Sequence, residues 1–349
     1  MSNDLVVKTK SREIEFDCLR IVAILAVIMI HCSAPFVIQF PKDSFNFAVA
    51  NLLDSISRIG VPFFVIISGY FLLNENRDIS AAKIKSKVCK MFFILGAWSL
   101  FYALLYNCKN FFNAFIYGHY HLWYLYMMIG LYLTTPILRL FVKKENKNYI
   151  YYLVALSLIF CFTPPLLSIL FSNDNEITKL ANQFQISFAG AFVSYYLIGW
   201  LFGQDYSLFK KRIKMCVLIA IAAIIFIFCG VQFVETKIVP YKVFYANTVL
   251  PVFIYSISSF LALYEFFKQI KSKFSKKVKT FISEMSKLTF GVYLVHISLL
   301  ELFKNEFKYN SEINAIAYIF FIYAITTISS FIVAFLLSKI KYINQLIKL

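Results

Sequence analysis

Charged residues are scarce in this chain of 349 residues: together they make up 15% of it, whereas hydrophobic residues make up 60%. A soluble domain carries about 25% charged residues. The apolar residues gather in runs of about twenty, the length that an α-helix needs to cross the hydrocarbon layer of a bilayer. The composition therefore excludes an ordinary soluble domain and predicts an all-α polytopic membrane protein.

The sequence also lacks the signs of a metal site, a disulfide framework or a repeat architecture. Its seven cysteines show no C-x-x-C spacing, and most lie in or beside apolar runs, where cysteine behaves as a small hydrophobic residue. We therefore expect no metal. We find no internal repeat, which weakens the case for an inverted-repeat transporter, and no attached soluble domain. No convincing cleavage site follows the first apolar run, so we expect it to be an uncleaved span.

Acidic residues are few, 18 against 35 Lys and Arg, and the formal net charge is +17. The basic residues cluster in every second loop between apolar runs, as the positive-inside rule requires of a multispanning protein. The charge therefore reports topology and contact with anionic lipid, and it does not indicate a nucleic-acid partner. The basic clusters lie at 77–90, 143–147, 210–214 and 268–287.

These patterns predict about ten transmembrane helices with both termini in the cytoplasm. We expect cytoplasmic tails at 1–15 and 339–349, one transmembrane domain over 16–338, and a basic stretch at 268–287 that lies along the inner surface. The expected spans are 16–38, 53–73, 90–107, 121–142, 150–171, 185–203, 214–234, 245–267, 288–304 and 313–338.

The first expected span, FDCLRIVAILAVIMIHC, contains two ionisable residues, Arg20 and His31. They are eleven positions apart, so they share one helix face, separated by about 16 Å at 1.5 Å per residue. Arg20 lies near the cytoplasmic rim, where it is either a snorkelling anchor or a ligand-binding cation. His31 is too deep to reach either surface. It is either a neutral residue hydrogen-bonded between helices or a general base, since the pKa of histidine lies near neutrality.

Further polar residues lie in the second, fourth and ninth expected spans. Asp54 and Arg58 form an i,i+4 pair, which is explained either by a structural ion pair or by a role of Arg58 in holding an anionic oxygen. Pro62 and the Ser68–Gly69 step predict a loosened or kinked helix.

In the fourth span the aromatic residues Trp123, Tyr124 and Tyr126 are typical of an interfacial belt. Two histidines, His119 and His121, lie at the outer mouth of this span. His296 lies near the midplane of the ninth span.

The chain resembles the acyltransferase 3 family of integral-membrane acyltransferases, in particular its short single-domain members. The resemblance rests on the R-x10-H spacing of Arg20 and His31, on RIGVPFFVIISGYFLL in the second span, on HLWYLYMMIGLYLTTPILR in the fourth and on GVYLVH in the ninth. Each motif alone is weak, but the four occur in order and cover nearly all of residues 13–338.

The resemblance implies an enzyme of the bacterial inner membrane that moves an acyl group, usually acetyl, from cytoplasmic acyl-CoA to a sugar hydroxyl. The acceptor would be a surface glycan or its lipid-linked precursor. The family's arginine and histidine fall on Arg20 and His31, which implies phosphate binding by Arg20 and catalysis by His31, either as a general base or as a carrier that relays the acyl group.

Other residues are weaker candidates for the same site. Arg58, with Ser68 or Tyr70, is a candidate for stabilising the oxyanion, and Lys85 and Lys87 are candidates for further CoA phosphate contacts. His121, Trp123 and His296 are candidates for a secondary or substrate site. Two other functions stay open: a polysaccharide exporter or secondary transporter, and an accessory subunit without activity.

Overall fold

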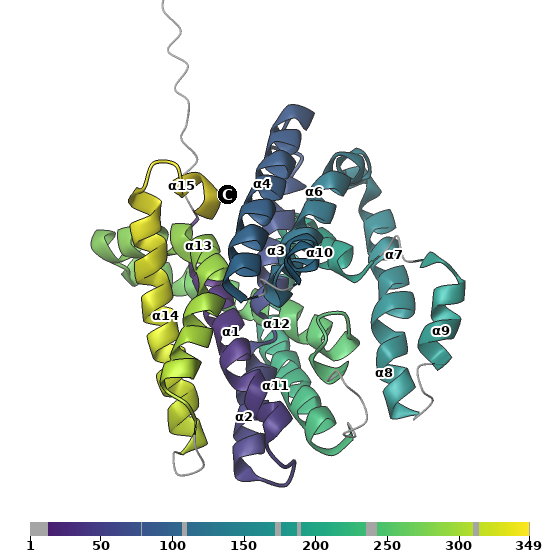
Figure 1. Ribbon diagram of the computed structural model, residues 1–349. Helices are drawn as coiled ribbons and strands as arrows, with labels where there is room; N and C mark the ends of the chain where they lie inside the picture. The colour runs from purple at the N-terminus through teal and green to yellow at the C-terminus, as the bar shows by residue number, and fades with distance from the viewer. Residues whose placement is uncertain are drawn as a thin grey trace, which may run out of the picture.

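The computed structural model of the chain describes residues 13–77, 79–106, 110–171, 176–186, 190–234, 243–309 and 314–348. The described part is helical and contains no strand (Figure 1). Residues 1–12 of the expected cytoplasmic tail lie outside it. The helices are α1 (Ile14–Gln39), α2 (Phe45–Ser57), α3 (Gly60–Leu72), α4 (Ala81–Tyr106), α5 (Phe111–Tyr117), α6 (Trp123–Phe141), α7 (Lys147–Ser157), α8 (Thr163–Leu170), α9 (Glu176–Gln183), α10 (Ala191–Lys211), α11 (Ile213–Cys229), α12 (Leu250–Ile270), α13 (Lys276–Glu306), α14 (Ala315–Lys339) and α15 (Asn344–Ile347).

Nine helical segments of the described chain are long and apolar enough to cross a membrane, and they correspond to nine of the ten expected spans. The chain is an all-α polytopic membrane protein, as expected. The remaining expected span, 185–203, falls on α10, which has 21 residues. This helix is not among the nine, and its second half carries Gln204, Asp205, Lys210 and Lys211. Its first half lies in the protein interior, where Tyr195 and Trp200 are almost completely buried.

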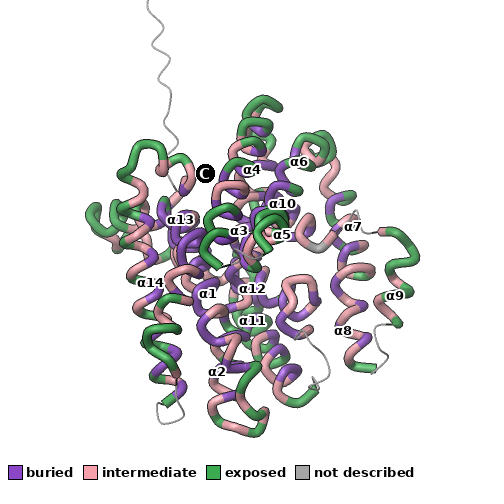
Figure 2. Tube along the Cα trace, viewed as in Figure 1, coloured by how far each residue is buried: buried purple, intermediate pink, exposed green. Residues whose placement is uncertain are grey.

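Helix α1 is the centre of the bundle and packs against α2, α3, α12, α13 and α14. Buried residues concentrate in α1, α3 and α10, whereas α9 and the outward face of α4 are exposed (Figure 2). Exposed apolar side chains on these outer faces suit contact with lipid, because hydrocarbon does not penalise them as water does.

The second span is interrupted near Pro62, one of the two places that the sequence predicted, and not at the Ser68–Gly69 step. The helix breaks between α2 and α3 at Arg58 and Ile59, one turn before Pro62. Proline lacks the N–H that would bond to the carbonyl of Arg58 four residues earlier, which explains a break at this point. The Ser68–Gly69 step stays helical within α3.

The expected surface stretch at 268–287 is also different in the structure. Residues from Lys276 onward are the first turns of α13, a single helix of 31 residues that continues to Glu306. Ser275 caps its start, because its side-chain oxygen accepts a hydrogen bond from the backbone N–H of Val278 at 3.3 Å. The basic side chains at the start of α13 are therefore held on the same rigid element as His296.

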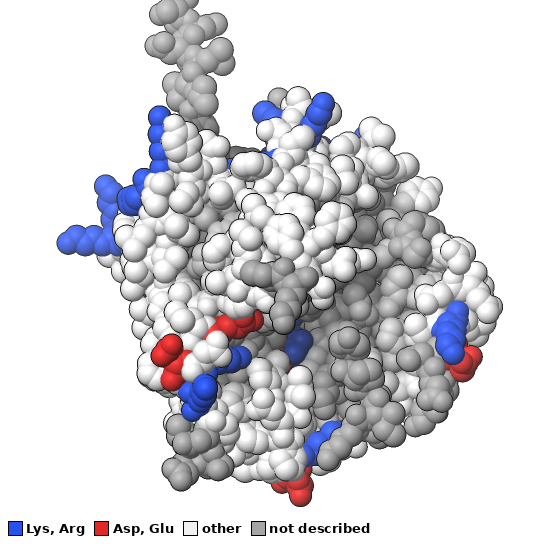
Figure 3. Space-filling model, in the orientation of Figure 1, with Lys and Arg blue, Asp and Glu red and all other residues white. Residues whose placement is uncertain are grey.

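Both ends of the described chain lie at one end of the bundle, since Glu13 and Lys348 line the same cavity. Figure 3 shows Lys and Arg without neighbouring Asp or Glu at this end, whereas several Lys and Arg lower on the same face lie near Asp or Glu. This clustering agrees with a cytoplasmic position for both ends, which stays a prediction.

Helices α3 and α10 lie side by side in the middle of the bundle (Figure 1) and cross at two glycines. A Cβ at Gly69 would lie 1.9 Å from the backbone oxygen of Tyr196, and a Cβ at Gly199 would lie 2.1 Å from that of Ile66. Only glycine permits this approach, which is the usual role of small residues between membrane helices.

We therefore predict that Gly69→Ala lowers the stability of the purified protein by about 1–3 kcal/mol, the range for an overpacked core, because the two backbones must move apart. Thermal unfolding in detergent measures the effect. Gly96→Ala is the matched control, since a Cβ at Gly96 meets nothing within 4 Å. Equal melting temperatures for Gly69→Ala and the parent protein would contradict the predicted close packing.

Candidate active site

A cavity of about 670 Å³ lies at the end of the bundle where the described chain begins and ends. This volume is within the range of about 300–1,000 Å³ that is typical of small-molecule sites. Its apolar and hydroxyl-bearing walls come from α3, α6 and α13. Five cationic side chains and one carboxylate also line it: Arg20, Arg77, Lys87, Lys287, Lys348 and Glu13.

Arg20 is held in this cavity by a buried carboxylate on its own helix. Its Nη1 lies 3.0 Å from Oδ1 of Asp17, which is completely buried. Asp17 also accepts hydrogen bonds from the hydroxyls of Ser283 at 2.9 Å and Ser286 at 2.8 Å, both on α13. A buried carboxylate needs such partners, and here they tie α1 to α13 and orient the guanidinium of Arg20.

Arg77 and Arg20 both line the cavity, and both guanidinium groups contact the ring of Phe71. Arg77 is 4.4 Å and Arg20 is 5.2 Å from the ring centroid of Phe71, distances at which a cation is attracted to the ring. Arg139 of α6 donates to the backbone oxygens of Leu72 at 2.7 Å and Arg77 at 2.9 Å. Carbonyls at a helix end lack partners within the helix, so Arg139 stabilises the end of α3 and the position of Arg77.

All four histidines of the chain lie together, deeper in the bundle than the cavity. The ring centroids of His31 and His296 are 5.2 Å apart, and those of His121 and His296 are 5.6 Å apart. Nδ1 of His119 lies 3.0 Å from Nδ1 of His121, so one of the two nitrogens donates to the other. The residues come from α1, α13 and the short turn before α6, and the cluster therefore forms only when these elements pack.

His296 has a defined tautomer. Its Nδ1 lies 2.7 Å from the backbone oxygen of Tyr293, which can only accept, so Nδ1 carries the proton. The Nε2 atoms of His296 and His121 are buried without a hydrogen-bond partner. His31 differs from both, because it is partly exposed. His119 is partly exposed as well, so His31 and His119 are the two members of the cluster that are not fully enclosed. Of these two, only His31 belongs to the R-x10-H spacing of the first span.

Two further contacts surround the cluster on its outer side. Nε2 of His119 lies 3.6 Å from Oε1 of Glu301, and the ammonium group of Lys304 donates to the backbone oxygen of His31 at 3.1 Å. Glu301 therefore faces His119 and not His296, in agreement with its place on another face of α13. Within the described residues, no group of three His, Cys, Asp or Glu side chains is arranged to hold a metal ion.

Tyr124 and Tyr293 separate the cavity from the histidines. Both line the cavity, both are buried, and their ring centroids are 5.2 Å apart. The hydroxyl of Tyr293 donates to the backbone oxygen of His121 at 2.7 Å. The same side chain thus forms the inner wall of the cavity and supports the histidine cluster.

The structure brings six of the ten candidate residues to these two places. The cavity is lined by Arg20, Ser68 and Lys87, and the cluster contains His31, His121 and His296. Lys85 is exposed and lies outside the lining. Trp123 is 41% exposed and packs on Phe192, as a belt residue would.

Tyr70 is not in the cavity lining, but it contacts Glu13 and Phe71, which are. Its hydroxyl donates to Oε2 of Glu13 at 3.5 Å, and its ring packs 4.4 Å from that of Phe16, outside the cavity lining.

Several residues of the site were not identified from the sequence. Tyr124 was interpreted as a belt anchor, but that interpretation is wrong, because Tyr124 is buried. Tyr293 lies one helical turn before His296, and this i,i+3 spacing was the one signal that placed both on one face. The cationic cavity residues that the sequence did not single out are Arg77, Lys287 and Lys348.

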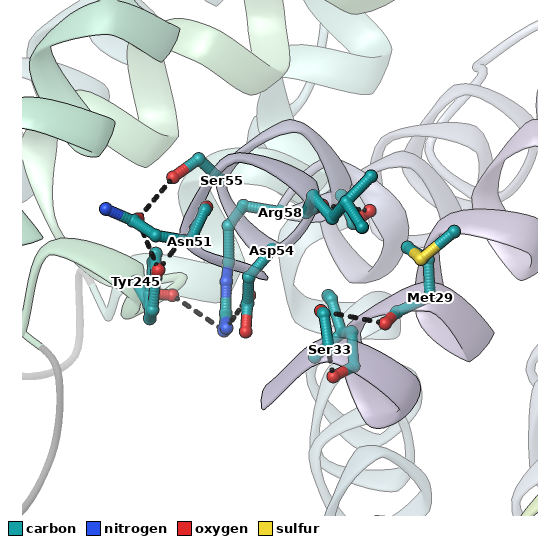
Figure 4. Close-up of polar contacts among 10 residues, drawn as sticks. Met29, Ser33, Asn51, Asp54, Ser55, Arg58 and Tyr245 are labelled. Atoms are coloured by element: carbon teal, nitrogen blue, oxygen red, sulfur yellow. Dashed lines mark hydrogen bonds and ion pairs between the residues drawn. The ribbon is translucent and has the colours of Figure 1, made fainter. Parts of the chain in front are cut away.

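Arg58 lies in a separate polar network near the outer half of α1 (Figure 4). Its Nη2 pairs with Oδ1 of the buried Asp54, its Nη1 donates to the backbone oxygen of Tyr245 at 3.2 Å, and its guanidinium lies 4.2 Å from the Tyr245 ring centroid. Arg58 does not line the cavity. The geometry favours the structural ion pair, and a role of Arg58 at an oxyanion stays a prediction.

We predict that Arg58→Gln destabilises the protein by about 3–5 kcal/mol, the range for breaking one partner of a buried ion pair, because Asp54 is left buried and uncompensated. Thermal unfolding in detergent measures the loss, and the double variant Asp54→Asn with Arg58→Gln should recover part of it. Unchanged stability together with reduced turnover would instead favour direct action of Arg58 on the substrate.

Comparison with known proteins gives one result that bears on function. The sequence model of an acyltransferase domain, that of the acyltransferase 3 family, matches residues 13–335. No curated protein and no solved structure matches the chain. The matched region contains every helix that lines the cavity or carries a histidine of the cluster. The chain therefore belongs to the acyltransferase 3 family of membrane acyltransferases.

Proposed function

We propose that the protein is an O-acyltransferase of the bacterial inner membrane, with acetyl as the transferred group. It takes the acyl group from acyl-CoA on the cytoplasmic side and transfers it to a hydroxyl of a cell-surface glycan or its lipid-linked precursor. The observation that carries this proposal is the position of the histidine cluster directly behind the tyrosine wall of a strongly cationic cavity.

The cavity suits the donor in charge and size. CoA carries several phosphate negative charges, and arginine and lysine side chains bind phosphate by charge-assisted hydrogen bonds. Arg20, Arg77 and Lys87 come from three different elements and all face this space. The pantetheine arm is long and narrow, so it suits the path from these cations towards Tyr124 and Tyr293.

His31 acts as the general base in this proposal. It accepts the proton of the acceptor hydroxyl, and the hydroxyl oxygen attacks the thioester carbonyl carbon. The tetrahedral intermediate collapses with cleavage of the C–S bond, and the thiolate of CoA takes the proton from His31. The products are the acylated glycan and CoA, and the base returns to its neutral form. Ser68, which lines the cavity, is a candidate hydrogen-bond donor to the carbonyl oxygen.

We expect His31→Ala to lower kcat by about 100- to 10,000-fold, the contribution of a positioned general base, while leaving CoA affinity unchanged. Acetyl transfer from labelled acetyl-CoA to glycan, measured beside CoA binding to the same purified variant, separates the two quantities. Full transfer by His31→Ala would remove His31 from the chemistry.

For Arg20→Ala we expect the opposite pattern. The KM for acetyl-CoA should rise about tenfold or more, because one charge-assisted phosphate contact of about 1.4 kcal/mol or more is lost, and kcat should change less. Arg20→Lys keeps the charge and should recover part of the affinity. An unchanged KM would count against phosphate binding by Arg20.

The acceptor is identified in cells. Mass spectrometry of surface glycans from a deletion strain and its parent should show loss of an acyl group from one sugar in the deletion strain. Identical glycans in both strains would contradict the proposed acceptor class.

A further inference from the structure

The segment after α14, residues 340–348, folds back across the end of the bundle where the cavity lies (Figure 1). It contains the short helix α15 and reaches Lys348, one of the five cations in the cavity lining. The other four cations come from α1, α4, α13 and the connection after α3. Lys348 is therefore the one lining cation that is not carried by a spanning helix or by a connection between spans.

The segment is anchored by specific contacts. The indole N–H of Trp98, on α4, donates to the backbone oxygen of Leu346 at 3.2 Å. Ile347 is 1% exposed and packs on α13 at Gly291, where an added Cβ would lie 3.3 Å from the Cβ of Ile347. A tail that served only to attract lipid headgroups would need neither the buried side chain nor the indole contact.

These contacts hold Lys348 at the wall of a cavity that four other cationic residues and one carboxylate, Glu13, also line. Bringing a fifth positive side chain beside Arg20, Arg77, Lys87 and Lys287 is unfavourable by itself, because like charges in a partly enclosed site repel. A polyanionic ligand removes this penalty. The anchoring contacts offset the repulsion while the ligand is absent.

We propose that the C-terminal segment is a part of the donor site and that Lys348 binds a phosphate group of the CoA moiety. This inference rests on the proposed function and adds to it a residue that determines donor affinity. The lysine acts on the phosphorylated part of the donor and has no role in the chemistry at the thioester.

The test is CoA binding to the full-length purified protein, measured by titration calorimetry in detergent. We expect Lys348→Ala to weaken CoA binding about tenfold, the loss of one charge-assisted phosphate contact, and Lys348→Arg to restore it. Lys341→Ala is the matched control, because Lys341 belongs to the same segment, is exposed and does not line the cavity. Its CoA affinity should equal that of the parent protein.

Pantetheine, which carries no phosphate, is the second probe. Its affinity, measured by competition, should be the same for Lys348→Ala and the parent protein. A parallel loss of pantetheine binding would mean that the variant damages the cavity wall, and it would overturn the phosphate assignment. An equal loss of CoA affinity in Lys341→Ala and Lys348→Ala would also overturn it, since that result indicates general attraction by the charge of the tail.

A double variant tests the anchoring. Trp98→Phe removes the hydrogen bond to Leu346 and keeps an aromatic ring, so it should weaken CoA binding in the same direction as Lys348→Ala. Because both changes act through one lysine, the double variant should lose less affinity than the sum of the two single losses. Full additivity would contradict the coupling between anchor and lysine.

The outcomes separate this inference from the proposed function. If the parent protein binds CoA and Lys348→Ala binds it equally well, the inference fails and the proposed function stands. If the parent protein binds CoA through Lys348 but transfers no acyl group to glycan, the inference stands and the proposed function fails. If the parent protein binds no CoA, both fail.

Discussion

The buried carboxylate of Asp17 sets the register between the two helices that carry the site. It accepts hydrogen bonds from Ser283 and Ser286, so α1 and α13 are tied together near the cationic cavity. Both helices run in the same direction from there. His31 follows Asp17 by 14 positions and His296 follows Ser283 by 13, which is about 20 Å along each axis at 1.5 Å per residue. Because the two helices rise by nearly the same distance from their contact at Asp17, the ring centroids of His31 and His296 come to lie 5.2 Å apart.

This register explains why the cavity and the histidine cluster are consecutive along the bundle. Asp17 orients Arg20 towards the cavity at one end, and the same pair of helices presents His31 and His296 at the other. Tyr293 lies between these two levels on α13 and takes part in both. A donor whose phosphates bind at the cations and whose thioester points towards the histidines matches this order of groups.

The close crossing of α3 and α10 has a complementary role. Gly69 and Gly199 permit the two backbones to approach each other. This contact fixes the face of α3 that is turned towards α10, and therefore also the face that is turned towards the cavity. Ser68 lines that cavity, whereas Tyr70, two positions later, points to Glu13 and Phe16. Two residues of one motif, two positions apart, thus differ in whether they line the cavity, because a helix turns by about 100° per residue.

The properties that depend on one helix at a time could be predicted from the amino-acid sequence. Composition and run length predicted the membrane class and nine of the observed spans, and the eleven-residue spacing placed Arg20 and His31 on one face. The i,i+4 pairing of Asp54 with Arg58 was equally visible, since both partners lie within two turns. The packing of the helices was needed to show which distant residues meet: His31 and His121 with His296, Arg77 and Arg20 at the ring of Phe71, and Lys348 in the cavity wall. The physical reason is that hydropathy indicates which helices lie in the membrane but carries no information on the rotation of a helix or on its register against a neighbour. Rotation and register are set by interhelical hydrogen bonds and by close contacts at glycine.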